Sequence, residues 1–286
     1  MGAAFLITLR EGMEAALIVA IILAYLRSVG RPDRFSLVWG GVWAAVAISL
    51  VTGAIIFAIA GGLPHTAGEI FEGVATLLAV VVLTWMIFWM RRNAINIKGE
   101  LQGKVDMALA SGSGLALVAL SFFVVVREGL ETVLFLFGAF QAGTETSGAL
   151  KFLGAVLGLV VAIALGILIY RGGIRLNLRT FFRVTGVLIL IVAASLLVYG
   201  IHELYEVGAF RFLEGTGLLG GSGAFGALTG LVNRIVVGLR GQPTWLELGA
   251  WLAYVVVTGV LFFRPAPAPA PRPSVEAEPA GDRSRA

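Results

Sequence analysis

A short charged run occurs twice in this chain, each time inside a stretch that is otherwise strongly apolar. Both runs read Arg-Glu-Gly-x-Glu; the first tetrad begins at Arg10 and the second at Arg127. On a helix, residues three apart lie on nearly the same face, so each tetrad can offer two carboxylates to one ligand. Carboxylate oxygens are the ligands that hard cations prefer. The tetrads therefore predict a cation site with the following ligands: Glu11, Glu14, Glu128 and Glu131.

The other tetrad residues fit such a site. Arg10 and Arg127 precede the second glutamate of their tetrad by four residues, where each can pair with it. The carboxylates outnumber the guanidinium groups, which favours a cation that must enter and then leave. The glycine between the glutamates leaves room for a facing helix or an ion. Alternatively, each arginine only pairs with its glutamate to hold two helices together, but this leaves Glu11 and Glu128 without a role.

Composition places the tetrads in a membrane. The chain has 286 residues, of which 58% are hydrophobic and 13% charged, with a mean hydropathy of +0.95. Continuous apolar runs favour helices over a barrel, and the first run, which carries tetrad charges and lacks a positive leader, is expected to be retained. Seven segments approach the roughly 20 residues needed to cross a bilayer: 3–26, 36–60, 70–90, 112–140, 149–170, 180–201 and 245–263. We predict an all-α polytopic membrane protein with seven transmembrane helices.

The basic residues predict its orientation, because cytoplasmic loops collect Lys and Arg. With the N-terminus outside and the C-terminus inside, fifteen of the 21 fall in inner segments: Arg27, Arg31, Arg34, Arg91, Arg92, Lys98, Lys104, Arg171, Arg175, Arg179, Arg183, Arg264, Arg272, Arg283 and Arg285. The outer segments hold only Lys151, Arg211, Arg234 and Arg240. The positive net charge reflects this bias and does not indicate nucleic-acid binding.

The chain also contains a weak internal repeat. The tetrads lie 117 residues apart, and the segment 40–47 resembles 154–161 at an offset of 114. Each unit would contain three spans, an odd number, so the second copy is inverted relative to the first. The predicted parts are a first repeat at 1–92, a cytoplasmic loop at 93–111, a second repeat at 112–206, a Gly-rich extracytoplasmic loop at 207–244, the seventh helix at 245–263 and a disordered Pro/Ala-rich cytoplasmic tail at 264–286.

A second group of acids is predicted at the outer face. Its members form a candidate outer site for arriving ions: Glu69, Glu72, His202, Glu203 and Glu206. Further residues fall on the same side and would help to concentrate cations: His65, Glu145, Glu214 and Glu247. The alternative for Glu69 and Glu72 is helix capping in a first turn. Cysteine is absent, which excludes thiolate sites and disulfides. Four tryptophans near span ends are assigned to the interfacial belt: Trp39, Trp85, Trp89 and Trp245.

Together these motifs resemble the oxidase-dependent iron permeases, the family of the yeast high-affinity iron permease and bacterial EfeU. The resemblance rests on both tetrads, on His202-Glu203-Leu204-x-Glu206, and on the approach to the last helix from Leu239 to Tyr254. It implies iron uptake across the plasma membrane, with the four tetrad glutamates as ion-binding positions and Arg10 and Arg127 as their flanking partners. A separate extracytoplasmic oxidase or iron-delivery protein is the implied partner.

The resulting hypothesis is an iron permease, not an enzyme, that passes Fe3+ or Fe2+ from the outer carboxylates to the tetrads. Iron is then a transported substrate, and no permanently bound cofactor is expected. Two alternatives stay open. The cargo is another divalent cation such as lead, because carboxylates separate these ions poorly; or the carboxylates hold a di-iron centre of a membrane oxidoreductase, although such sites normally add Glu-x-x-His pairs.

Overall fold

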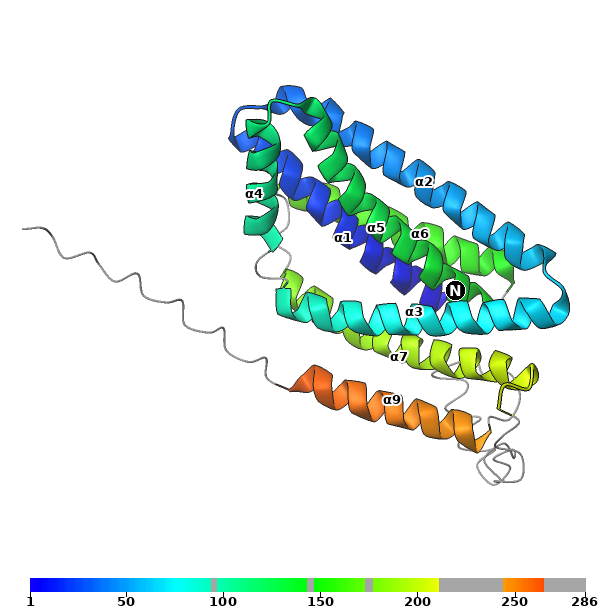
Figure 1. The fold of residues 1–286 in the computed structure, drawn as a ribbon. Coiled ribbons are helices and arrows are strands. Elements are labelled where there is room, and N and C mark those ends of the chain that lie inside the picture. The colour runs from blue at the N-terminus through cyan, green and yellow to red at the C-terminus, as the bar shows by residue number, and fades with distance from the viewer. Residues whose placement is uncertain (94–96, 143–146, 173–176, 211–243, 265–286) are drawn as a thin grey trace, which may run out of the picture.

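The computed structural model of the protein describes residues 1–93, 97–142, 147–172, 177–210 and 244–264, and the regular elements in these ranges are all helical (Figure 1). In chain order they are α1 (Gly2–Ser28), the short 3-10 helix η1 (Pro32–Arg34), α2 (Phe35–Gly62), α3 (His65–Asn93), α4 (Ile97–Ala110), α5 (Gly114–Gln141), α6 (Gly148–Tyr170), α7 (Leu178–Glu206) and α9 (Trp245–Phe263). The predicted all-α class is confirmed. Most of the predicted outer loop at 207–244 and of the tail at 264–286 lies outside the described residues.

Five segments of the described chain are long and apolar enough to cross a membrane: Pro32–Gly62, His65–Arg91, Gly148–Tyr170, Thr180–Glu206 and Trp245–Phe263. They support a polytopic membrane protein. Helices α1 and α5 have comparable lengths of 27 and 28 residues, but they carry the tetrad charges. Apart from Arg27 at the end of α1, the charged residues of these two helices are those of the tetrads.

The segment predicted as the loop 93–111 contains a helix, α4. Its buried residues Leu101, Val105 and Ala108 are spaced four and three apart, so they form one apolar stripe. This stripe packs against α1 and α5, with which α4 makes its contacts. The segment is too short and too polar to span a bilayer, which is why its sequence was assigned to a connection; packing against two longer helices stabilises it as a helix.

Three helix pairs dominate the packing: α1 with α6, α2 with α5, and α3 with α7. Each pair approaches closely at glycine. A Cβ built on Gly158 of α6 would lie 3.0 Å from the backbone N of Leu9, and one on Gly41 of α2 would lie 2.9 Å from that of Phe122. In the third pair, a Cβ on Gly73 would lie 3.2 Å from the carbonyl oxygen of Gly200. Small residues at helix contacts are the usual way for membrane helices to pack, because close backbones gain dispersion contacts.

The tetrads lie between two apolar clusters. Along α1, Ile7 belongs to a cluster formed mainly with α3 and α7, whereas the residues from Ile18 onward belong to another formed with α2, α4 and α5. Along α5 the two clusters follow in the opposite order. Val125, before the second tetrad, belongs to the cluster of Ile18, and Phe135, after the tetrad, belongs to the cluster of Ile7. The charged groups therefore occupy a polar layer enclosed by apolar packing above and below.

Candidate metal site

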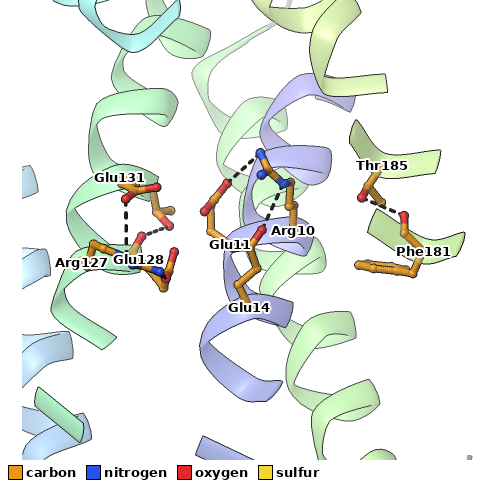
Figure 2. Close-up of polar contacts among 9 residues, drawn as sticks. Arg10, Glu11, Glu14, Arg127, Glu128, Glu131, Phe181 and Thr185 are labelled. Carbon is orange, nitrogen blue, oxygen red and sulfur yellow. Dashed lines mark hydrogen bonds and ion pairs between the residues drawn. The ribbon is translucent and has the colours of Figure 1, made fainter. Parts of the chain in front are cut away.

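The two tetrads meet where α1 and α5 contact each other. Figure 2 shows Glu11 on α1 directed toward the carboxylates of α5. Glu11, Glu128 and Glu131 each offer one carboxylate oxygen, and these three oxygens all lie within 4.8 Å of one another. Ligands of a hard cation lie about 2.0–2.6 Å from it, so opposite ligands are about 4–5 Å apart. The three carboxylates can therefore share one cation without a change in the backbone.

In the part of the chain that the structure describes, four carboxylate oxygens of this group are buried without a hydrogen-bond partner: Glu11 Oε1 and Oε2, Glu128 Oε2 and Glu131 Oε2. Leaving such an atom buried without a partner costs free energy, more so when it is charged. A cation placed among these oxygens would satisfy them. The donor set consists of oxygen alone, which fits a hard cation and disfavours a soft one.

Glu14 does not belong to the three-carboxylate group. It pairs with Arg10, whose Nε lies 3.2 Å from Glu14 Oε1, while Arg10 Nη1 lies 3.7 Å from Glu11 Oε1. The arginine side chain is only 2% exposed. The predicted pairing of the first arginine with the second glutamate is therefore present, and Arg10 holds both carboxylates of its tetrad.

The second arginine also forms the predicted ion pair with the glutamate four residues later, but its shorter contacts are with another residue. Arg127 donates hydrogen bonds to Oε1 of the adjacent Glu128 through both Nε, at 3.1 Å, and Nη2. Glu131, the expected partner four residues later, is 3.8 Å away. The Arg127 side chain is 48% exposed, and its guanidinium carbon lies 5.7 Å from the centre of the Trp89 ring. Trp89 was assigned to the interfacial belt, and its contact with the tetrad could not be read from spacing along one helix.

The glycine of each tetrad faces a small residue on the helix paired with its own. A Cβ on Gly12 would lie 2.8 Å from the Cβ of Ala162 on α6. A Cβ on Gly129 would lie 2.8 Å from the Cβ of Ser49 on α2, and closer still to its hydroxyl. Real Cβ atoms almost never approach so closely. The glycines therefore serve the helix contact that holds each tetrad in place.

The structure also brings together part of the predicted outer group. Glu69, Glu203 and Glu206 offer oxygens within 4.8 Å of one another. Glu72 accepts a hydrogen bond of 3.0 Å from the Tyr199 hydroxyl, and the ring nitrogens of His202 lie 3.3 Å from Glu206 Oε1 and 2.8 Å from Glu247 Oε1. His65 Nδ1 lies 2.9 Å from Glu69 Oε1. Glu145 and Glu214 fall outside the described residues.

Sequence reasoning missed Tyr199 altogether, and it placed Glu247 on the outer side without its contact with His202. Tyr199 precedes Glu203 by four residues on α7, a spacing that places both on one face. Glu247 closes a capping box at the start of α9, where its Oε2 accepts a hydrogen bond of 2.8 Å from the Thr244 amide. The Thr-x-x-Glu pattern could have predicted this cap, but not that α9 would place the same carboxylate against His202.

The sequence is similar to those of known iron permeases. The sequence matches the iron permease FTR1 family over residues 1–264. It is 41% identical to the ferrous iron permease EfeU of Escherichia coli O6:K15:H31 (strain 536 / UPEC) over 264 residues, covering 91% of this chain and 95% of that protein. It is 40% identical to the ferrous iron permease EfeU of Yersinia pestis, covering 91% and 93%, and 41% identical to a protein of Escherichia coli K12 named a putative inactive ferrous iron permease EfeU, covering 91% and 95%. No solved structure matches the chain significantly. The resemblance inferred from the tetrads is thereby confirmed, and the chain belongs to the iron permease FTR1 family.

Proposed function

We propose that this protein imports iron across the plasma membrane and binds it in transit between the two tetrads. The observation that carries the proposal is the group of buried carboxylates that α1 and α5 contribute jointly, whose oxygens include several without a hydrogen-bond partner among the described residues. A site built from two helices can open when those helices move apart, whereas a site on one helix cannot. The relatives are named ferrous iron permeases, which favours Fe2+ as the ion offered; Fe3+, the harder ion, would bind the same oxygens more tightly.

In this proposal α1 and α5 cross the membrane with the five apolar spans. At 1.5 Å per residue, their 27 and 28 residues extend about 40 Å, more than the roughly 30 Å of hydrocarbon. Their charges are tolerable because the tetrad glutamates and Arg10 are largely buried between helices, and the half-exposed Arg127 is paired with Glu128. The distribution of Lys and Arg then places the N-terminus outside and the C-terminus inside.

The packing supports two inverted repeats, α1 to α3 and α5 to α7. If α1 is exchanged with α5, α2 with α6, and α3 with α7, the pair α1–α6 becomes α5–α2 and the pair α3–α7 is unchanged. The contacts of Gly12 with Ala162 and of Gly129 with Ser49 are exchanged in the same way. Transporters with inverted repeats bind their substrate near the middle of the membrane between the repeats and expose it alternately to each side. The tetrads occupy the corresponding place in this chain.

The outer group would receive the ion first. Glu69, Glu203 and Glu206 lie toward the ends of α3 and α7 that face outside in the proposed orientation. Their negative charge would raise the local cation concentration. A separate oxidase or iron-delivery protein, implied by the family resemblance, would act at this face.

The test is uptake of radioactive iron, offered as Fe2+ and as Fe3+, into cells that express the native chain or Glu128→Gln/Glu131→Gln at matched membrane levels. The double variant should lose uptake in both forms because it removes two of the three convergent carboxylates. Glu100→Gln, on the exposed pair with Lys104 of α4, is the matched control and should transport normally. Normal uptake by the double variant would contradict the proposal.

Two further measurements test the alternatives, one on cells and one on the purified protein. Competition by unlabelled lead that is as effective as competition by iron would favour a transporter of divalent cations in general. A purified protein that retains an iron cluster with its own optical absorption would favour the oxidoreductase. The oxidoreductase has less structural support, because both histidines of the chain, His65 and His202, lie in the outer group and not beside the tetrads.

A further inference from the structure

Thr76 of α3 carries a buried hydroxyl group with an unusual lack of partners. Its side chain is 0% exposed, and its Oγ1 has no hydrogen-bond partner in the part of the chain that the structure describes. Five other helical threonines donate to the carbonyl oxygen four residues earlier: Thr8, Thr84, Thr132, Thr185 and Thr258. That local bond is the usual way to satisfy a hydroxyl within a helix. Thr76 does not use it, so its oxygen is free to bind something else.

Thr76 lies on the face of α3 that carries the outer acids. Glu69, Glu72 and Thr76 are separated by three and four residues, so they share one face of the helix. This face is turned toward α7, since Glu72 accepts a hydrogen bond from Tyr199 and the intervening Gly73 packs on Gly200. Thr76 is therefore the next polar group inward from the outer site, about 6 Å beyond Glu72 along the helix.

The same hydroxyl faces α5 at a glycine. A Cβ built on Gly138 would lie 3.6 Å from Thr76 Oγ1 and 3.6 Å from Leu196 Cδ2, so the hydroxyl lies where α3, α5 and α7 meet. Gly138 follows Glu131 by seven residues, which places both on one face of α5 about 10 Å apart. Whether its position is measured along α3 or along α5, the Thr76 hydroxyl therefore lies on the outer side of the second tetrad.

Beyond Thr76 the packing toward the tetrads is apolar. Phe135 lies between Gly138 and Glu131 on α5, is fully buried, and belongs to an apolar cluster that also contains Ile7, three residues before Arg10. The hydroxyl is consequently the last group with an unused oxygen before an apolar barrier. A cation that crosses such a barrier must give up part of its water, and an oxygen ligand at the barrier's edge compensates for that loss.

We infer that Thr76 Oγ1 is an intermediate ligand for the iron on its way from the outer carboxylates to the second tetrad. This inference rests on the proposed function. A neutral hydroxyl is a hard ligand, but it binds a cation less strongly than a carboxylate does. It therefore suits a position where the ion must pause and continue, whereas the tetrads hold the ion between the two repeats.

The test compares Thr76→Val, which removes the oxygen at nearly constant volume, with Thr76→Ser, which keeps it. Thr258→Val is the matched control, because Thr258 is equally buried but bonded to its own helix. Initial rates of iron uptake at matched membrane levels should fall about tenfold for Thr76→Val, as expected when one hydrogen-bond-sized interaction is lost from the barrier. Thr76→Ser should keep more than half of the native rate, and Thr258→Val should transport as the native chain does.

Thermal unfolding of the purified proteins separates transport from folding. The midpoint for Thr76→Val should equal or exceed the native value, because the substitution removes a buried hydroxyl without a partner. Native uptake by Thr76→Val, or equal losses in Thr76→Val and Thr76→Ser, would overturn the inference and leave the proposed function intact. If the native chain itself imported neither Fe2+ nor Fe3+, the proposed function would fail, and this inference with it.

Discussion

The first and second tetrads have the same motif but different surroundings. In the first, Arg10 is 2% exposed and holds both glutamates of its own helix. In the second, Arg127 is 48% exposed, bonds mainly to Glu128 and leaves Glu131 at a longer distance. Figure 2 shows Phe181 and Thr185 of α7 on the Arg10 side of α1, whereas Arg127 has Trp89 of α3 beside it. One tetrad is enclosed and the other is open on one side.

The same sequence motif can therefore lie in two different environments within one chain. The helix pairs that hold the tetrads, α1 with α6 and α5 with α2, correspond to each other under the proposed exchange of repeats. Under the proposed function, one repeat moves against the other during transport. The two tetrads therefore need not have the same surroundings in any one conformation.

The largest expected effect distinguishes the two arginines. Arg10→Gln leaves buried carboxylates without their partner and should lower the free energy of unfolding by about 3–5 kcal/mol. Arg127→Gln also leaves the buried Glu128 carboxylate without its arginine, but Arg127 is half-exposed and water can replace part of the contact, so the cost should be smaller, about 1–3 kcal/mol. Unfolding of the purified variants in detergent measures both, with Arg31→Gln, from the exposed pair with Asp33, as the control. Equal losses for the two tetrad variants would mean that the difference in exposure has no energetic consequence.

A smaller loss of stability is expected from substitutions at the tetrad glycines, which make equivalent helix contacts in the two tetrads. Gly12→Ala would press on Ala162 and Gly129→Ala on Ser49, and we expect each to cost about 1–3 kcal/mol through overpacking. Ala162→Gly should restore Gly12→Ala, and Ser49→Gly should restore Gly129→Ala, because each removes the clashing atoms. The melting temperatures of the single and double variants measure this coupling.

The crossed pairs are the control for this experiment. Gly12→Ala with Ser49→Gly, and Gly129→Ala with Ala162→Gly, join changes on different helix pairs and should show simple addition of their separate effects. Rescue by a crossed pair would mean that the glycines act through the whole bundle and not through their own helix contacts.

Much of this arrangement follows from local sequence, and its limits are equally specific. The helical class, the pairing of Arg10 with Glu14 and the gathering of Glu69 with Glu203 and Glu206 depend on spacing within a helix and on which helix ends share a side. The enclosure of Arg10, the exposure of Arg127 and the contact of Glu247 with His202 depend on which helices become neighbours. Periodicity along one helix carries no information about such neighbours.

Helix α4 is a second case in which the outcome depends on neighbouring helices. Its stripe of Leu101, Val105 and Ala108 is visible in the sequence, yet a helix of 14 residues is marginal without a surface to pack against. That surface is provided by α1 and α5, the two helices that carry the tetrads. The prediction of a loop at 93–111 considered membrane-spanning length alone, and for that reason it did not include the helix that the structure shows within it.

The smallest expected effect concerns Trp89, whose ring lies beside the arginine of the second tetrad. Its contact with Arg127 should contribute about 0.5–1 kcal/mol as a cation–π interaction at a partly exposed site. Trp89→Leu should therefore lower the melting temperature slightly in the native background and have no further effect in Arg127→Gln, because the partner is already gone. Trp43→Leu, at an exposed tryptophan of α2, controls for the loss of an aromatic ring at the surface. If Trp89→Leu still lowered the melting temperature in Arg127→Gln, Trp89 would stabilise the protein as part of the interfacial belt and not through its contact with Arg127.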